Sequence, residues 1–543
     1  MMEKQKTKPS NKRDTGLLRS SFVVSFFTGL SRVAGLVRDV VFARLIGADA
    51  LADVFFVAFK IPNFFRRIFA EGAFSQAFVP VLGEYREGKS KNAVKNFISK
   101  VSGTFGFTLA FFGLFFILAV PFFSALFAPT WYLNDPEKFD ALKGMLQITF
   151  PYLIFISMTG LAGAVLQSYD RFAVPAATPI ILNITLILAA IFLAPMLEYP
   201  VFALAWGVLI AGIVQFCFQL PFIYRIGLLT PPSIDWRDPG VTKILKLMAP
   251  AIFGVSVSQI NLLLDTILAT FLPTGSVSWL YYSDRITELP LGIFAIAIAV
   301  VILPNLSRMH AAKSIENFSE TLDWGIKMIF YIALPSTIAI LILSEPILVA
   351  LFFYGDVMTA MDMKMASFSL SAYALGLTGF MLIKVLAPGF FARQDMITPV
   401  RVGIIAMIAN MVFNLALVIP LFFFFNLGHV GLALATSISS FLNAGLLLYY
   451  SLKKGFYIPL PGWARFFLRI SVSLLIMVFV LGWISESLGL NNREFWLNSD
   501  FWNRGSRLIV VCVVGMCVYI LSLFFFGVRK ADFIAPSKGV SSD

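Results

Sequence analysis

Long apolar stretches recur along the whole chain and constrain its fold more than any other feature of the sequence. One α-helix needs roughly 20 consecutive apolar residues to cross a bilayer core about 30 Å thick. Of the 543 residues, 59% are hydrophobic and only 13% are charged, whereas soluble domains typically have about 25% charged residues. The sequence therefore predicts an all-α integral membrane protein, and it argues against a soluble enzyme, a nucleic-acid-binding protein or a disordered scaffold.

Hydropathy divides the chain into about 14 membrane-spanning helices, joined by connections too short for a soluble domain. Residues 1–16 form a basic tail directly before the first span, so no cleavable signal peptide is expected. Residues 529–543 form a second tail. The predicted spans are 17–47, 51–83, 95–127, 139–168, 174–196, 200–225, 240–272, 276–309, 319–353, 360–390, 397–424, 428–453, 463–489 and 505–528.

Basic residues are distributed unequally between the two sides of this predicted bundle. Counted together with the basic residues at the adjoining span ends, 28 of the 42 Lys and Arg residues lie at the two tails and the even-numbered connections, and six lie at the odd-numbered connections. Cytoplasmic segments of membrane proteins carry an excess of Lys and Arg. Both termini are therefore expected in the cytoplasm, which agrees with an even number of spans.

The remaining eight basic residues lie inside predicted spans and give the strongest functional signal. A charge at mid-membrane costs about 2.5–3.5 kcal/mol, so it needs water, a partner or a ligand. Arg44 and Lys60 lie near span ends and are expected to extend to the interface. An unpaired cationic wall predicts an anionic cargo, since the arginine fork suits phosphate oxygens. The arginines expected to border such a cavity are Arg32, Arg38, Arg66, Arg67 and Arg285; Lys384 is the eighth residue.

Helical spacing predicts the local surroundings of these arginines. Arg32 and Asp39 share one helix face, whereas Arg38 lies about 120° from Arg32 around the helix. Arg67 and Glu71 form an i, i+4 pair, which leaves Arg66 without a local partner. In the eighth span, Arg285 lies between two acidic residues, Asp284 and Glu288.

A second polar group lies in the seventh, eleventh and twelfth spans. Carboxylate, amide and hydroxyl oxygens suit a hard cation such as sodium. The same groups also form ordinary hydrogen bonds between membrane helices, so both interpretations remain open. The residues are Ser258, Asn261 and Asp265 in the seventh span, Asn410 and Asn414 in the eleventh, and Thr436 in the twelfth.

Catalytic motifs do not stand out in the sequence. Residues 83–90 match the pattern GxxxxGK[ST], but a phosphate-binding loop follows a β-strand, and here a membrane helix precedes the motif. The three cysteines and two histidines have no metal-ligating spacing. A membrane-embedded glycosyl- or phosphotransferase would need a carboxylate and metal cluster, which is not found. We therefore predict that the protein is not an enzyme.

Short matches between the two halves of the chain predict an internal duplication. Thr178-Pro179 lies near the start of the fifth span, and Thr398-Pro399 lies near the start of the eleventh, 220 residues later. Duplicated halves are typical of alternating-access transporters. The prediction is two six-helix lobes, residues 17–225 and 240–453, related by a pseudo-twofold axis, with two additional helices at residues 463–528.

Three stretches of the sequence resemble one known family of membrane proteins. They are residues 31–39 (SRVAGLVRD), residues 53–80 and residues 278–285 (SWLYYSDR). In these stretches, and across all fourteen spans, the chain is similar to the MurJ/MviN family of lipid II flippases. That family belongs to the multidrug/oligosaccharidyl-lipid/polysaccharide exporter superfamily.

The resemblance implies a function, a location and a set of partners. Members of the family move undecaprenyl-pyrophosphate-linked disaccharide pentapeptide, lipid II, from the cytoplasmic to the periplasmic face of the bacterial cytoplasmic membrane for peptidoglycan assembly. Expected partners are lipid II, membrane lipids and cell-wall synthesis proteins, without nucleic acid. Residues 463–528 would form the groove for the polyprenyl tail.

The resemblance also implies site residues. The family's central-cavity arginines fall on Arg32, Arg38, Arg66 and Arg285, and further family motif positions are Asp39, Asp53, Arg67 and Glu71. The only cofactor that it implies is a sodium ion, at Asp265, Asn410, Asn414 and Thr436.

Two other transport functions remain as alternatives. An exporter of another polyprenyl-linked glycan would share the same charge pattern, and only the specific motifs disfavour it. A multidrug or cation antiporter on the same scaffold would present carboxylates or aromatic side chains to a cationic cargo. The excess of intramembrane arginine argues against this second alternative.

Overall fold

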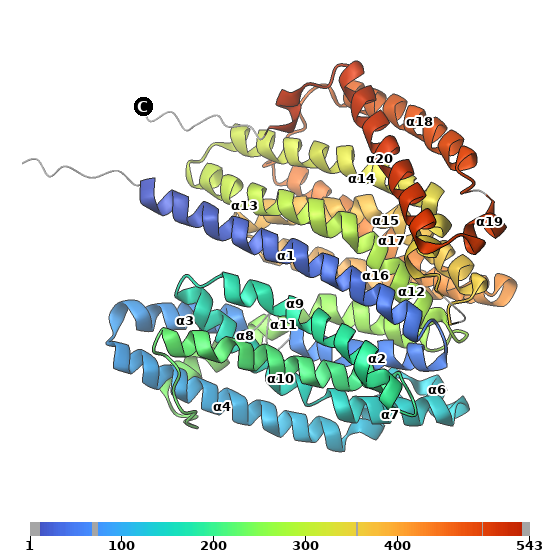
Figure 1. The fold of residues 1–543 in the computed structure, drawn as a ribbon. Coiled ribbons are helices and arrows are strands. Elements are labelled where there is room, and N and C mark those ends of the chain that lie inside the picture. The colour runs from blue at the N-terminus through green and yellow to red at the C-terminus, as the bar shows by residue number, and fades with distance from the viewer. Residues whose placement is uncertain (1–10, 68–73, 355–356, 491, 535–543) are drawn as a thin grey trace, which may run out of the picture. The chain divides into compact units, whose positions relative to one another are not determined.

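The computed structural model describes residues 11–67, 74–354, 357–490 and 492–534, and over these residues the chain is helical (Figure 1). No β-strand occurs in the described ranges. Eleven of the described helices, some of them continuous runs of shorter helices, are long and apolar enough to cross a membrane. The prediction of an all-α membrane protein is therefore confirmed.

Many of the predicted spans coincide with a single helix. Their ends differ from the predicted ends by only a few residues, because the change from apolar to polar residues defines both. These helices are α1 (Asn11–Leu45), α10 (Phe202–Arg225), α11 (Pro239–Ala269), α14 (Ile315–Phe352), α15 (Ala360–Phe391), α16 (Ile397–Phe425), α17 (Gly428–Lys453), α18 (Trp463–Ser487) and α20 (Phe501–Phe525).

The other predicted spans are runs of shorter helices. In the runs that begin with α4, α7, α9 and α12, proline lies at or beside a break, as Pro121, Pro151, Pro195 and Pro290 show, because proline lacks an N–H group and clashes with the preceding turn. The runs are α2 (Ala50–Arg66) and α3 (Ser75–Gly88); α4 (Lys91–Leu118) and α5 (Val120–Phe127); α7 (Pro136–Thr149) and α8 (Tyr152–Ser168); α9 (Ala173–Leu188) with η2 (Ala189–Leu193) and η3 (Ala194–Met196); and α12 (Ser276–Pro290) with η4 (Leu291–Ala295) and α13 (Ile296–Ala311). The remaining short elements are α6 (Pro129–Asn134), α19 (Arg493–Asn498) and η5 (Lys530–Phe533).

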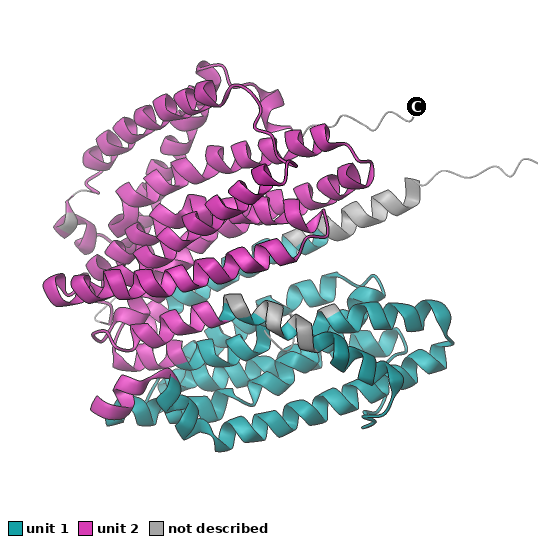
Figure 2. Cartoon of the chain, turned by 180° about the vertical axis from the view of Figure 1, so that it is seen from behind, with its two compact units in different colours: residues 1–41, 58–126, 136–259 teal, residues 42–57, 127–135, 260–543 magenta. Residues whose placement is uncertain are grey.

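The chain divides into two compact units, which are coloured separately in Figure 2. Four helices, α1, α2, α5 and α11, run from one unit into the other, and α11 does so between Gln259 and Ile260. The assignment of residues 17–225 and 240–453 to two repeated lobes stays a prediction. Unit 1 comprises residues 1–41, 58–126 and 136–259, and unit 2 comprises residues 42–57, 127–135 and 260–543.

Aromatic stacking holds together the core of unit 1. The ring of Phe74 stacks on that of Phe105 at 4.2 Å between centroids, and Tyr85 stacks on Phe97 at 4.1 Å. Phe74 and Phe97 belong to a buried cluster with residues from α3, α4, α8, α10 and α11, and the partly buried rings of Phe105 and Tyr85 pack against it. Such rings bury large apolar areas, so this packing fixes the helices of the unit against one another.

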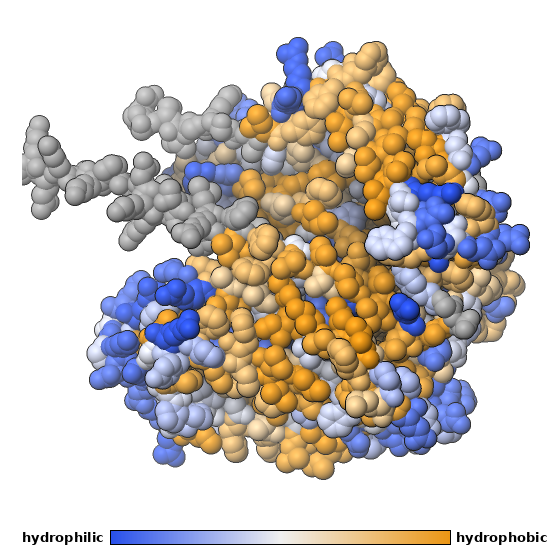
Figure 3. Space-filling view, viewed as in Figure 1, coloured by the Kyte–Doolittle hydropathy of each residue, from blue (hydrophilic) through white to orange (hydrophobic). Residues whose placement is uncertain are grey.

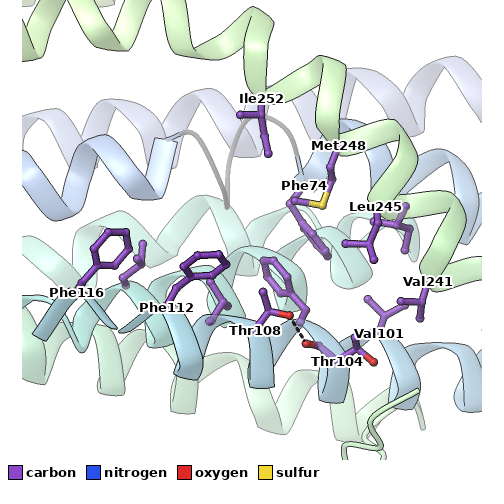
Figure 4. A pocket seen from close by; sticks show the side chains of 14 residues that line it. Phe74, Val101, Thr104, Thr108, Phe112, Phe116, Val241, Leu245, Met248 and Ile252 are labelled. Atoms are coloured by element: carbon purple, nitrogen blue, oxygen red, sulfur yellow. Dashed lines mark hydrogen bonds between the residues drawn. The ribbon is translucent and has the colours of Figure 1, made fainter. Parts of the chain in front are cut away.

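A small apolar pocket lies between α4 and α11 in unit 1 (Figure 4). Phe112 and Val101 of α4 face Leu245 and Met248 of α11 across it. Its volume is about 110 Å³, and its lining carries no charged side chain. It is therefore unsuited to a charged cargo.

Small residues bring α15 and α17 close together in unit 2. A Cβ atom added at Gly376 would lie 2.5 Å from Ser437 Oγ, and one added at Gly379 would lie 2.4 Å from Ser440 Oγ. Ser440 also donates a hydrogen bond of 3.1 Å to the carbonyl of Gly376. Close approach at small residues, supported by hydrogen bonds, is a general way in which membrane helices associate.

The helices α18 and α20 pack on each other and on α14. Tyr519 of α20 donates to the carbonyl of Tyr331 in α14 at 3.0 Å. At the other end of the pair, Arg504 donates to the carbonyls of Val349 and Phe353 at 3.2 and 3.0 Å. These carbonyls end α14, where a cation is favourable. The two C-terminal helices thus attach to the rest of unit 2 through α14.

Apolar side chains cover the middle of the helix surfaces. In unit 1, seen at the bottom of Figure 3, hydrophilic residues gather at the two ends and hydrophobic residues lie between them. Phe111 and Phe115 of α4 are examples of exposed hydrophobic residues in unit 1. An apolar middle with polar ends is the arrangement that suits a protein crossing a bilayer.

Candidate functional site

The guanidinium of Arg38 is buried inside unit 1 and has an acidic partner. Its Nε and one terminal nitrogen donate to Asp39 Oδ1 at 3.0 and 2.7 Å. The other terminal nitrogen donates to Asn183 Oδ1 of α9 at 3.0 Å. Arg38 and Asp39 are only 6% and 2% exposed. The pair therefore compensates its own charge, and through Asn183 it joins α1 to α9.

Arg32 lies on the same helix but has different surroundings. Among the described residues, its guanidinium makes no ion pair, and its Nε is buried without a hydrogen-bond partner. Asn183 donates to the carbonyl of the preceding residue, Ser31, at 3.0 Å, and it lies beside Gly35, one turn further along α1. Arg32 thus provides a positive charge beside the contact between α1 and α9.

At the end of α2, two predicted site residues have amide partners. Arg66 donates through Nε to Asn63 Oδ1 at 3.1 Å, so the expectation that Arg66 lacks a local partner is wrong. Asn63 lies one turn earlier on the same face. Arg67 donates to Gln259 Oε1 of α11 at 3.4 Å. Glu71, the predicted partner of Arg67, lies outside the described residues.

Asp53 caps the N-terminus of α12 in unit 2. One carboxylate oxygen accepts from the N–H of Gly275 at 2.7 Å, and the other accepts from the N–H and hydroxyl of Ser278 at 2.9 and 2.6 Å. A carboxylate is favourable at this end of a helix because the first N–H groups there lack helical partners. Asp53 therefore joins α2 to α12, and a contact with substrate stays a prediction.

Arg285 in α12 lies beside both an acid and an aromatic ring. It forms an ion pair of 3.0 Å with Glu288, one turn further along the helix, and its guanidinium carbon lies 4.9 Å from the centre of the Tyr281 ring. Tyr281 in turn stacks on Phe56 at 3.9 Å. Because one third of the Arg285 side chain is exposed, it remains accessible to a ligand.

The polar residues of α11, α16 and α17 come together in unit 2. Asn414 donates to Asp265 Oδ1 at 2.7 Å, and Thr436 donates to Asp265 Oδ2 at 3.4 Å. The side-chain amide of Asn410 lies 3.0 Å from that of Asn414. The polar residues that were selected from three separate predicted spans therefore do form one cluster in the structure.

This polar cluster has the chemistry of a small cation site. Asn410 and Asn414 are 0% and 1% exposed, and Asn414 Oδ1 is buried without a hydrogen-bond partner. A buried carbonyl oxygen without a partner is costly in a protein interior. Together with the Asp265 carboxylate and the Thr436 hydroxyl, it forms an oxygen-rich ligand set that fits a hard cation.

Sequence reasoning missed three polar residues that support the site. Asn183, Asn63 and Ser439 contact Arg38, Arg66 and Asn410, respectively. The available signal was a polar residue inside an apolar span, which usually faces protein. The sequence alone does not tell which helix such a residue faces.

Comparisons with known proteins give a consistent result. The profile of a family described as lipid II flippase MurJ matches residues 42–503. A probable lipid II flippase MurJ of Vibrio cholerae serotype O1 is 47% identical over 528 residues, which cover 96% of this chain and 98% of that protein. The lipid II flippase MurJ of Burkholderia cenocepacia is 38% identical over 517 residues, with coverages of 94% and 96%.

Solved structures extend the comparison to the fold. A lipid II flippase MurJ in an inward closed conformation matches with a TM-score of 0.76 at 28% identity, covering 93% of this chain and 98% of that chain. An inward-facing multidrug resistance transporter of the MATE family matches with a TM-score of 0.65 at 13% identity, covering 78% and 94%. The second likeness shows a shared fold alone.

Proposed function

The chain belongs to the MurJ family of lipid II flippases, and from this premise we propose that it moves lipid II from the cytoplasmic to the periplasmic face of the bacterial cytoplasmic membrane by alternating access. The family match over most of the chain supports this function. The diphosphate of the cargo has to cross an apolar core, where an uncompensated charge is costly. Cationic side chains inside the spans would provide the compensation.

The surroundings of Arg32 give the main structural support for the proposal of diphosphate binding. Its guanidinium has no acidic partner among the described residues, and its Nε is buried without a hydrogen-bond partner. An arginine fork binds phosphate oxygens in a bidentate manner. Arg32 would therefore contact the diphosphate. Arg66 and Arg285, whose described partners are an amide and a partly exposed carboxylate, would also take part in cargo binding.

Arg38 and Asp39 have a different part in the proposal. Every nitrogen of the Arg38 guanidinium donates to Asp39 or Asn183. The pair would fix the face of α1 that presents Arg32, rather than supply a free positive charge. Arg67, Glu71 and Asp53 would serve as supporting residues in cargo binding.

We also propose a sodium ion as a bound cofactor in the polar cluster of unit 2. Asp265, Asn410, Asn414 and Thr436 would hold it through carboxylate, amide and hydroxyl oxygens. The partnerless Asn414 Oδ1 supports this assignment. When bound, the ion would supply a positive charge that compensates the Asp265 carboxylate.

The sodium proposal predicts stabilisation that depends on the cation. In purified protein, sodium chloride should raise the melting temperature more than potassium chloride at equal ionic strength, since ligand binding stabilises the folded state. Asp265→Asn should remove this difference, whereas Asp140→Asn, on a surface ion pair, should keep it. Equal effects of the two salts on the unmodified protein would contradict a sodium site.

The orientation and partners complete the proposal. Both termini would lie in the cytoplasm because the basic residues are concentrated on that side. Lipid II and bilayer lipids are then the immediate partners, and cell-wall synthesis proteins would receive the translocated precursor. The family match favours this function over a drug antiporter and over export of another glycan.

Depletion of the protein in cells tests the function. We expect lipid II to accumulate on the cytoplasmic face, and the unmodified gene to reverse the accumulation. Arg32→Ala should fail to do so at normal expression. Arg401→Ala, which alters an exposed arginine at the start of α16, should succeed. Normal translocation by Arg32→Ala would refute the role of this residue, and normal translocation without the protein would refute the function.

A further inference from the structure

A polar cavity of about 560 Å³ lies in unit 2, and its lining contains none of the residues assigned to the diphosphate and sodium sites. Its volume is within the roughly 300–1,000 Å³ typical of small-ligand sites. Three segments line it: the first half of α14, the start of α18, and the turn η5 that follows α20. The charged residues of its lining are Glu320, Asp323, Lys327, Arg465, Arg469 and Asp532.

On the inner wall of the cavity, the buried carboxylate has an ion-pair partner and hydrogen-bond donors. Asp323 is fully buried and forms an ion pair of 2.7 Å with Lys327. It also accepts hydrogen bonds from Tyr457 at 2.9 Å and from the indole N–H of Trp463 at 3.0 Å. This wall anchors the start of α18 to α14 and leaves no net charge to attract a ligand.

The outer part of the cavity has unpaired charges of both signs. Among the described residues, the guanidinium groups of Arg465 and Arg469 form no ion pair, and neither do the carboxylates of Glu320 and Asp532. Two positive and two negative groups therefore line one cavity without compensating each other through direct contact.

The turn η5 closes the cavity over α14. The ring of Phe533 lies 5.2 Å from that of Tyr331, and a Cβ atom added at Gly527 would lie 3.2 Å from a terminal nitrogen of Arg469. Asp532 Oδ2 accepts from the Arg529 N–H at 2.8 Å, which fixes the turn. The carboxylate of Asp532 is thus held at the mouth of the cavity.

The cavity lies at the ends of helices that could cross a membrane. Arg465 is the third residue of α18, and η5 follows the end of α20; both helices are long and apolar enough to cross a membrane. Trp463 and Trp324 belong to the same region, and tryptophan is enriched at membrane interfaces. Phe466 and Ile534 add apolar surface to the lining. A ligand with a polar head and apolar chains suits this place.

From this arrangement we propose that the cavity binds the head group of a zwitterionic membrane phospholipid, one with a phosphodiester and a primary ammonium. Arg465 and Arg469 bind the phosphate oxygens, since guanidinium groups suit phosphate. Glu320 and Asp532 bind the ammonium. An anionic head group without an amine would leave these two carboxylates repelling it.

Lipid binding to purified, delipidated full-length protein tests the proposal. Phosphatidylethanolamine and phosphatidylglycerol with identical acyl chains are titrated, and bound lipid is counted by native mass spectrometry. We expect phosphatidylethanolamine to bind at least about tenfold more tightly, a difference in the range that one well-placed ionic contact supplies. Equal affinities of the two lipids would overturn the proposal.

Charge-changing variants locate the site. The double variant R465Q/R469Q should lose most phosphatidylethanolamine binding. The double variant E320Q/D532N should lose the preference for phosphatidylethanolamine and gain affinity for phosphatidylglycerol. The matched control is R401Q/E316Q, whose changes lie at exposed positions at the starts of α16 and α14; it should keep the original preference. An unchanged preference in E320Q/D532N would overturn the assignment.

Two further measurements separate alternative explanations. Soluble glycerophosphoethanolamine should compete only weakly, because it lacks acyl chains; competition as strong as that of the lipid would refute a membrane lipid as the ligand. Elution volume and melting temperature show whether each variant is folded. If R465Q/R469Q is unfolded, the preference of E320Q/D532N still decides the result, and neither measurement depends on lipid II transport.

Discussion

At the scale of single residues, the buried pair of Arg38 and Asp39 has the most direct consequence for stability. Asp39→Asn would leave the Arg38 guanidinium buried without its anion, and loss of one partner of a buried pair costs about 3–5 kcal/mol. We expect a clear fall in melting temperature of the purified protein. Asp140→Asn, whose carboxylate is 70% exposed in its ion pair with Lys143, should cost no more than about 1 kcal/mol. Similar losses in both variants would contradict the buried pairing.

The carboxylate of Asp395, in the connection between α15 and α16, should make the stability of the folded protein depend on pH. Partial burial alone would raise its pKa, but hydrogen bonds from Lys454 and Thr398 hold the pKa of this carboxyl at about 2, below its ordinary value of 3.8. A carboxyl whose pKa is lower in the folded state than in the unfolded state stabilises the folded protein at pH values above its unfolded-state pKa. The contribution is therefore complete above about pH 4 and disappears as the pH falls towards 2.

Removal of this carboxylate tests the pH dependence. Asp395→Asn should lower stability at pH 7 by at most about 1 kcal/mol, because solvent screens the exposed Lys454 partner. The difference from the unmodified protein should shrink between pH 4 and pH 2 in thermal unfolding experiments. A difference that is constant across this interval would show that the ion pair is not its source.

At the scale of helices, close packing of α15 on α17 depends on glycine. A Cβ atom at Gly376 would lie 2.6 Å from Ser437 Cα, a backbone atom that cannot move away alone. Gly376→Val should therefore push the helices apart and destabilise unit 2 by about 1–3 kcal/mol or more. On α17, a Cβ atom at Gly445 would meet nothing within 4 Å, so Gly445→Ala is the matched control and should be tolerated. Equal melting temperatures for both variants would contradict the packing.

Polar residues inside spans could be selected as site residues from the sequence, whereas a contact at the end of a distant helix could not. Asp265, Asn410, Asn414 and Thr436 could be selected because each is polar inside an apolar span, and the structure brings them together. The capping of α12 by Asp53 could not be predicted in this way. The two elements are more than 200 residues apart in sequence, and the hydropathy of α2 contains no information about where α12 begins.

At the scale of the whole molecule, the distribution of basic residues predicts the orientation in the membrane. A fluorescent protein fused to either terminus should fold in the cytoplasm, and alkaline phosphatase fused there should stay inactive. Alkaline phosphatase inserted after Glu198, between α9 and α10, should be active because that connection is predicted to be periplasmic. Activity at a terminus, or inactivity after Glu198 in a stably expressed fusion, would contradict the orientation.

The sequence by itself determined the class of fold, the approximate limits of the spans and the residues that bear unusual charge. These properties are local, because the cost of placing a side chain in a bilayer depends on that side chain and its immediate neighbours along the helix. Only the tertiary structure decided that Arg38 has a partner in Asn183, that Asp53 caps another helix, and that α18, α14 and η5 enclose a polar cavity. Such contacts depend on which faces of distant helices meet, and that choice follows from packing across the whole unit.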